Sequence, residues 1–292
     1  MPSIRQRQRT VVAVGLLVLV VLSGCAGLSG TGSPTPSTAD PATLTPSVTQ
    51  TPTAPASQTA PPTAASPERL PSGLTDSGVR NVTQLIRTHQ ATAIETPGVV
   101  THTTNSTAPG LSVVASVRVA AEKNLTRVRH VAQSRRTTES ETQNSTTVVA
   151  ANGTSVRQYT FAGGNVTLDN RRNRTELFDR ALRGLSTATS PLRGALRRGN
   201  FSVTGSDESD NATVVTLRGD RYAGSQLYAA ENVVGYNATV RITTDGLIRS
   251  ATERIVAQRN GSESHYYFTY DFEPQSVDLP PVPQIPREID LR

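Results

Sequence analysis

The stretch LIRSATERIVAQRNGSESHYYFTYDF, residues 247–272, decides the fold. Apolar and polar residues alternate through Leu247–Ala257 and again through Ser264–Phe272, with the two-residue period of a β-strand. Asn260-Gly261 between them favours a tight hairpin turn, because both residues readily adopt a positive φ. The stretch therefore predicts two antiparallel strands joined by a short turn.

Comparable segments fill much of the chain before this stretch. Turn signals at Asn152-Gly153, Gly163-Gly164 and Asp245-Gly246 separate further runs of alternating residues. The additional strands that we expect are Val99–Thr104, Leu111–Glu122, Leu125–Arg135, Thr146–Ala151, Ser155–Phe161, Val166–Asp169, Phe201–Thr204, Ala212–Arg218 and Ala238–Thr243. Strands linked by hairpins form an antiparallel sheet.

A helix is expected ahead of these strands. Apolar residues recur at helical spacing over residues 79–89, and Asp76 or Ser77 is the expected N-terminal cap. The helix should end before Pro97, because proline has no N–H to continue the hydrogen-bond pattern.

A second helical region is expected over residues 175–198, between two runs of strands. Thr175 is its expected cap, Pro191 should break or kink it, and Gly199 should end it. Runs of hairpins with helices gathered in two places predict an α+β fold, in which a curved antiparallel sheet, or half-barrel, wraps around a few helices.

Residues 26–71 have a different composition, rich in Ser, Thr, Pro and Ala and almost without charge. Such a segment cannot bury enough apolar surface to offset the entropy lost on ordering, so we expect a disordered stalk. Its Ser, Thr and Pro content is also typical of O-glycosylated stalks. The expected organisation is a signal peptide at 1–24, a lipidated cysteine and stalk at 25–71, and one domain at 72–292.

The first residues predict export. Three arginines in residues 5–9 precede VVAVGLLVLVVL, residues 11–22. Twelve residues are too few to span a hydrocarbon core about 30 Å thick, but they fit the apolar part of a secretory signal. The separated arginines favour the general secretory route over the twin-arginine route.

The signal ends in Leu-Ser-Gly-Cys, residues 22–25. This motif resembles the lipobox of bacterial and archaeal lipoproteins, which implies cleavage between Gly24 and Cys25 and attachment of a lipid to the Cys25 thiol. Cys25 is the only cysteine in the chain. We therefore expect a protein anchored by its lipid to the extracellular side of the cell membrane, with no disulfide.

Two further resemblances extend over most of the chain, with loose motifs. The order of helix, strands, broken helix pair and strands resembles bacterial lipoprotein carriers and their mycobacterial relatives, whose half-closed sheet can enclose a lipid. The lipobox, the Thr/Pro-rich linker and TTDGLIR, residues 243–249, resemble haloarchaeal lipoproteins of unknown function.

Eleven asparagines begin an N-x-S/T triplet without proline, the acceptor motif for N-glycosylation. Asn200 is the weakest candidate, since it falls between a predicted helix and strand. The other candidates are Asn81, Asn105, Asn124, Asn144, Asn152, Asn165, Asn173, Asn211, Asn237 and Asn260. Threonine-rich strands with asparagine turns also generate such triplets by composition, so both interpretations stay open.

No catalytic motif stands out. The four histidines, His89, His102, His130 and His265, lack metal-ligand spacing, and no nucleophile elbow or phosphate-binding loop is present. His89 is better explained as a packed residue of the first helix. We expect no enzyme, no metal and no cofactor.

Three other clusters have a functional and a structural interpretation. The acidic residues Asp207, Glu208 and Asp210 suit either a calcium site or a solvated turn. The arginines suit either anionic lipid headgroups or a solvated face: Arg171, Arg172, Arg174, Arg193, Arg197 and Arg198. The aromatic run at residues 266–272 suits either an apolar cavity or ordinary sheet core.

The net charge is +6, and removal of the three signal arginines leaves +3, which is weak support for a polyanionic partner. Nucleic-acid binding is not expected, because the protein is exported and its arginines are not interleaved with aromatics. The sequence favours a monomeric, non-enzymatic binding domain for a lipid or other apolar ligand. The alternative is a glycosylated structural or interaction protein of the cell envelope.

Overall fold

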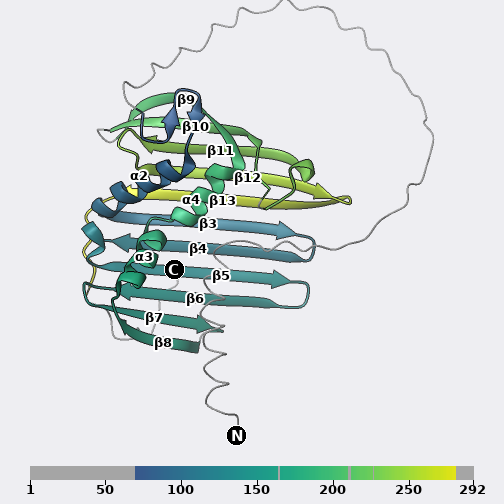
Figure 1. The fold of residues 1–292 in the computed structure, drawn as a ribbon. Helices are drawn as coiled ribbons and strands as arrows, with labels where there is room; N and C mark the ends of the chain where they lie inside the picture. The colour runs from purple at the N-terminus through teal and green to yellow at the C-terminus, as the bar shows by residue number, and fades with distance from the viewer. Residues whose placement is uncertain (1–69, 164, 210–211, 226, 281–292) are drawn as a thin grey trace, which may run out of the picture. The chain divides into compact units, whose positions relative to one another are not determined.

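A computed structural model describes residues 70–163, 165–209, 212–225 and 227–280, all within one compact unit, residues 64–292. Their centre is an 11-stranded antiparallel sheet in the order β8-β7-β6-β5-β4-β3-β13-β12-β11-β10-β9 (Figure 1). The sheet is curved and open, and helices lie along one face, so the predicted α+β half-barrel is confirmed. The strands are β3 Gly98–Ala108, β4 Leu111–Ala121, β5 Val128–Thr138, β6 Thr142–Ala151, β7 Ser155–Ala162, β8 Asn165–Asn173, β9 Gly199–Ser209, β10 Ala212–Tyr222, β11 Val233–Thr243, β12 Ile248–Arg259 and β13 Ser262–Pro274.

The sheet consists of two meanders joined near its centre. Strands β3–β8 follow one another through hairpins, and so do β9–β13. One long-range pairing, between β3 and β13, connects the meanders, with Thr107 opposite His265 at one end and Gly98 opposite Pro274 at the other. The hairpin predicted from residues 247–272 is β12–β13, and it lies beside this junction.

Strands β8 and β9 form the two edges of the sheet, and this explains where the helices lie. The link between them is α3, Glu176–Ser186, followed by α4, Thr189–Arg198, and it crosses one face of the sheet (Figure 1). Helix α2, Val82–Glu95, packs beside α4 on that face. We call the helix-covered face the inner face and the opposite one the outer face.

Helix α2 begins later than the sequence predicted. Its N-cap is Asn81, whose Oδ1 accepts a hydrogen bond from the Gln84 amide at 3.0 Å. The predicted cap at Asp76 or Ser77 is wrong, because residues 74–79 form a small antiparallel pair, β1 Leu74–Thr75 and β2 Gly78–Val79.

The second helical region is capped and ended as expected but is broken elsewhere. Thr175 Oγ1 accepts from the Phe178 amide at 3.3 Å, and Gly199 follows the last residue of α4. The break is at Ala188, whose φ is +49°, and not at Pro191. Pro191 lies in the first turn of α4, where a helix does not require the missing N–H.

Two turns show the role of left-handed residues. Asn260 and Gly261, with φ of +51° and +75°, close the β12–β13 hairpin as predicted. Asn124 and Leu125, with φ of +57° and +55°, form a short 3-10 turn, η1 Lys123–Leu125. Strand β5 consequently starts at Val128, three residues after the predicted start. A second short 3-10 turn is η2 Ala230–Asn232.

The hydrophobic core fills the space between the helices and the inner face. Its most buried members include Leu85, Leu182, Leu192, Leu217, Ile242, Ile248 and Phe268, none of them more than 1% exposed. From the aromatic run, Phe268, Tyr270 and Phe272 belong to this core, whereas Tyr267 lies on the outer face and is 45% exposed. The run therefore forms ordinary sheet core with one exception.

Candidate ligand-binding face

His89 holds α2 against the sheet and against the α3–α4 break. Its Nε2–H donates to the Thr187 carbonyl at 3.0 Å, and its Nδ1 accepts from the Ile248 amide at 3.1 Å. Burial lowers the pKa of His89 from 6.5 to about 4, so the ring is neutral at pH 7. Both ring nitrogens are thus used in packing, as the sequence suggested.

Arg198 holds the end of α4 against the inner face. Its side chain is 7% exposed and its Nε donates to both carboxylate oxygens of Glu253, at 3.0 and 3.2 Å; the Glu253 side chain is fully buried. Burial alone would lower the pKa of Arg198, but the bonds to Glu253 outweigh burial and raise it. Grouping Arg198 with the exposed Arg193 and Arg197 as a solvated face was wrong, because Arg198 lies at the buried end of the helix.

Two tyrosines complete this cluster. Tyr236 donates its hydroxyl hydrogen to Glu253 Oε1 at 3.4 Å, and the Arg198 guanidinium lies 5.1 Å from the centre of the Tyr266 ring. A buried ion pair stabilises only when further hydrogen bonds satisfy its polar atoms. The cluster meets that condition, and we assign it to holding the helices in place.

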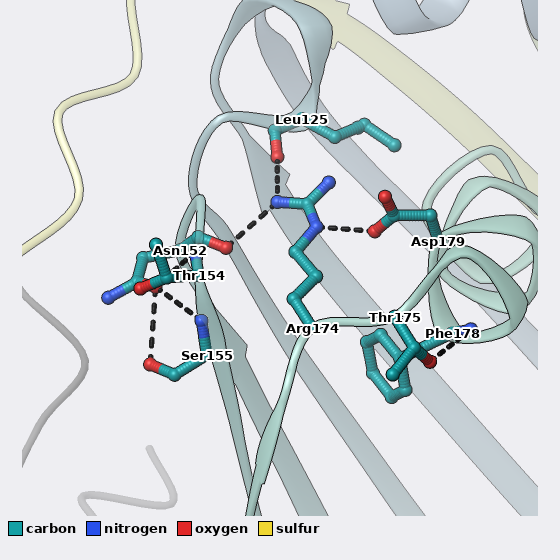
Figure 2. Close-up of polar contacts among 8 residues, drawn as sticks. All are labelled: Leu125, Asn152, Thr154, Ser155, Arg174, Thr175, Phe178 and Asp179. Carbon is teal, nitrogen blue, oxygen red and sulfur yellow. Dashed lines mark hydrogen bonds and ion pairs between the residues drawn. The ribbon is translucent and has the colours of Figure 1, made fainter.

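Arg174 connects the start of α3 to the sheet (Figure 2). Its Nη1 donates to the carbonyls of Leu125 and Asn152, each at 2.9 Å, and its Nε pairs with Asp179. Two turns of the sheet and the first turn of α3 therefore meet at one guanidinium. The neighbouring Arg171 and Arg172 are exposed, so of this predicted cluster only these two are available to headgroups.

Farther from the helices, the inner face changes from apolar to small and hydroxylic. The cross-strand row that includes Val100 and Val119 is buried. The next row of this face contains His102 and Val117. In the row after that, small side chains face one another directly across five strands, in the order Thr104, Ala115, Ser134, Ser145 and Ala162. We call these five residues the small-residue row; all but Ala162 are half-buried.

Two histidines share the inner face with the small-residue row, His102 in the adjoining row and His130 in the buried row beyond it. His130 is 4% exposed, and the Nδ1 atoms of His102 and His130 have no hydrogen-bond partner among the described residues. Burial lowers the pKa of each from 6.5 to about 4, and the nearby His130 adds to the lowering at His102. A neutral imidazole with a free, buried nitrogen can donate or accept one hydrogen bond.

Sequence spacing did not reveal this pair. His102 and His130 are 28 positions apart, and only the register of β3, β4 and β5 brings them to one face. The sequence does place His102 within an alternating strand. Only the hairpin register, however, shows that His102 and His130 lie on the same face.

The acidic residues do not form the predicted turn. Strand β9 runs through Asp207 and Glu208, which as neighbours in a strand point to opposite faces. Asp207 pairs with Arg241 at 2.7 Å, and Glu208 accepts from Thr213 at 2.7 Å; Asp210 lies outside the described residues. In the described part of the chain, no group of three or more potential ligands could hold a metal ion.

The glycosylation candidates are mostly accessible. Those described as exposed are Asn81, Asn105, Asn124, Asn144, Asn165, Asn173, Asn200, Asn237 and Asn260. Asn152 is half-buried, and its Oδ1 accepts from the backbone and hydroxyl groups of Thr154 and Ser155 (Figure 2). Asn211, Gly24 and Cys25 lie outside the described residues. Residues 70–280, apart from the gaps named above, contain no helix that is both long and apolar enough to cross a membrane.

No protein-family model and no curated protein matches the chain. Among solved structures, it is similar to LprF from Mycobacterium bovis, with 14% identity and a TM-score of 0.32, over 68% of this chain and 96% of that one. A beta-barrel-like protein from Brucella abortus shows 9% identity and a TM-score of 0.24, over 61% and 98%. The MucA/MucB complex of Pseudomonas aeruginosa shows 9% and 0.14, over 67% and 99%. These likenesses are too loose to support an argument about this chain, and the haloarchaeal resemblance stays a prediction.

Proposed function

We propose that this protein is a non-enzymatic binding domain for a lipid or other apolar ligand. The ligand lies on the inner face, along the small-residue row. The observation that carries the proposal is the half-buried row of small side chains, together with the unpartnered, buried Nδ1 of His102 in the adjoining row. Such an arrangement suits a ligand with an apolar body and one hydrogen-bonding group.

The dimensions of the row fit an acyl chain. The row crosses five strands, and neighbouring strands lie about 4.8 Å apart, so it is roughly 19 Å long. An acyl chain spans half of a hydrocarbon core, or about 15 Å. Small side chains let such a chain approach the backbone, and the neutral His102 in the adjoining row can bind an ester or hydroxyl group without introducing a charge.

A binding role also fits three titratable groups that are enclosed between the helices and the sheet. His89, Arg198 and Glu253 are each fixed by two or more partners and hold the helices to the sheet. A catalytic acid or base needs a position from which it can reach a substrate. These groups are enclosed in the fold, which supports binding without catalysis.

Adjacent residues of β4 provide a matched test, because Ala115 faces inward and Val114 faces outward. We expect native mass spectrometry of the full chain to show an apolar mass that organic extraction removes. Ala115→Phe should lose this mass and Val114→Phe should keep it. Ser134→Phe provides a second inner-face variant if Ala115→Phe does not fold. The proposal fails if the wild-type protein carries no such mass, or if inner and outer variants behave alike.

We propose further that a lipid on Cys25 anchors the domain to the extracellular side of the cell membrane. The support is the Leu-Ser-Gly-Cys motif at residues 22–25 and the apolar segment before it. Cys25→Ser should release the protein into the medium or leave its signal uncut. Membrane retention of a processed Cys25→Ser protein would contradict the anchor.

The second candidate is a glycosylated structural or interaction protein of the envelope without a small ligand. The exposure of nine sequon asparagines favours it. It predicts that envelope proteins captured with the full chain are lost after enzymatic removal of N-glycans, and that no apolar mass co-purifies. An extractable mass together with glycan-independent capture would exclude this candidate.

A further inference from the structure

Three sequon asparagines lie in one cross-strand row of the outer face. The residues that face one another directly across seven strands are, in order, Asn237, Arg254, Tyr267, Asn105, Val114, Arg135 and Asn144. We call this the asparagine row. All three asparagines are exposed, and each belongs to a different hairpin.

The spacing along the asparagine row is even. Asn237 and Asn105 are three strands apart, and so are Asn105 and Asn144. With neighbouring strands about 4.8 Å apart, each interval is roughly 14 Å. Three bulky groups attached at these positions would cover the width of seven strands without colliding with one another.

The next row of the outer face is also polar. Its residues carry hydroxyl or amide groups, in the order Thr239, Thr252, Thr269, Thr103, Ser116, Gln133 and Thr146. Thr239 and Thr146 are themselves the hydroxyl residues of the Asn237 and Asn144 sequons. In a strand, residues i and i+2 share a face, so the two sequon side chains emerge side by side and away from the core.

Tyr267 is the one aromatic side chain in the asparagine row. It lies directly opposite Asn105, and the residue is 45% exposed. Directly opposed residues have Cβ atoms about 4.5–5.5 Å apart, which is within reach of the first sugar of a glycan on Asn105. The C–H face of a sugar ring can pack on the tyrosine ring and remove its apolar surface from water.

We propose that N-linked glycans on Asn105, Asn144 and Asn237 cover the outer face, and that Tyr267 packs against the glycan on Asn105. The glycans leave the inner face as the accessible face for a ligand. Asn152 contrasts with these sites, because it is half-buried in its turn and its Oδ1 is engaged in hydrogen bonds. The inference is independent of the proposed ligand.

The first experiment determines occupancy. The full chain is purified from a host whose exported proteins carry N-glycans, and its proteolytic peptides are analysed by mass spectrometry before and after enzymatic deglycosylation. We expect sugar mass on the peptides with Asn105, Asn144 and Asn237. Unmodified peptides at these three positions, in a preparation where other sequons are occupied, would overturn the proposal.

The second experiment is a double-mutant cycle for the Tyr267 contact. In glycosylated protein, Asn105→Gln and Tyr267→Ala should each lower the Tm by about 2 °C, and the double variant should lose no more than either alone. Asn144→Gln is the control, because Asn144 lies opposite Arg135 and four strands from Tyr267, so its effect should add to that of Tyr267→Ala.

The cycle has a clear opposite outcome. Additive effects of Asn105→Gln and Tyr267→Ala would show that the ring and the glycan do not interact. So would a Tyr267→Ala shift of equal size in protein made without glycans. Either result would overturn the role of Tyr267 while leaving the occupancy result to be judged on its own.

Discussion

The inner and outer faces of this sheet are made from alternate residues of the same strands, yet they treat polar groups differently. On the inner face, Glu253 and His130 are almost completely buried, and each is paired or neutral. On the outer face, the side chains of Arg241 and Asn105 are accessible to solvent. Alternate positions along a strand lie on opposite faces. Whether a polar side chain must be paired or neutral therefore depends on which of the two alternating sets of positions it occupies.

Two arginine–carboxylate pairs make this comparison concrete. Arg198–Glu253 on the inner face has side chains that are 7% and 0% exposed, and Arg241–Asp207 on the outer face has side chains that are 39% and 55% exposed. Both are close contacts. A charge left without its partner is strongly destabilising only where water cannot reach it.

The largest expected effect comes from breaking the inner pair. Glu253→Ala leaves the Arg198 charge buried and unpaired, and we expect it to lower the free energy of unfolding by about 3–5 kcal/mol. Asp207→Ala on the outer face should cost at most about 1 kcal/mol. Urea denaturation of both variants measures the difference, and equal costs would show that the two faces do not differ in this respect.

The histidines give the next largest effect. Burial lowers the pKa of His89, His102 and His130 from 6.5 to about 4, so between these values the unfolded chain binds protons that the folded chain does not. Their stabilisation is therefore complete above pH 6.5 and is lost as the pH falls toward 4, at about 3 kcal/mol for each histidine. Denaturation measured from pH 7 to pH 4 tests this.

The variant His130→Leu tests whether the pH-dependent loss of stability comes from the buried histidines. His130→Leu removes one of the three titrating groups and its unpartnered nitrogen, so it should reduce the pH-dependent loss by about a third. An unchanged pH dependence in His130→Leu would mean that acid destabilisation arises elsewhere in the molecule.

Conservative substitutions at two positions of β12, three residues apart, give the smallest difference. Ile255 is fully buried on the inner face, whereas Thr252 is exposed on the outer face. We expect Ile255→Val to cost about 1 kcal/mol and Thr252→Ala to stay within about 0.5 kcal/mol of the wild type. Thermal unfolding of the two variants measures both costs. A larger loss of stability in Thr252→Ala than in Ile255→Val would contradict the assignment of the faces.

Local signals in the sequence were enough to predict the α+β class and much of the element order. Turns such as Asn260-Gly261 and the cap Thr175 act through a few neighbouring atoms, so they can be recognised without knowledge of the fold. The predicted cap of α2 was wrong because residues 74–79 pair with each other instead, which propensity alone does not reveal.

Features that depend on distant contacts could not be predicted. The pairing of β3 with β13 joins segments that are more than 150 residues apart, and it alone places Tyr267 beside Asn105. Arg198 looked like a surface residue because its partner, Glu253, belongs to a strand 55 positions later. The alternation predicts which residues share a face of one strand, but the cross-strand rows require the register.

The central claim, that the inner face binds an apolar chain and the outer face does not, can be tested with single tryptophans, because the chain has none. Val113 and Ser112 are adjacent in β4, and both are half-buried. Val113 faces inward, next to the small-residue row, and Ser112 faces outward, next to the asparagine row. Titration with a nitroxide-labelled 16-carbon fatty acid, used as a probe of roughly the length of the row, should quench Val113→Trp fluorescence with saturation and leave Ser112→Trp unquenched. Equal quenching of the two tryptophans, or none in either, would contradict the account.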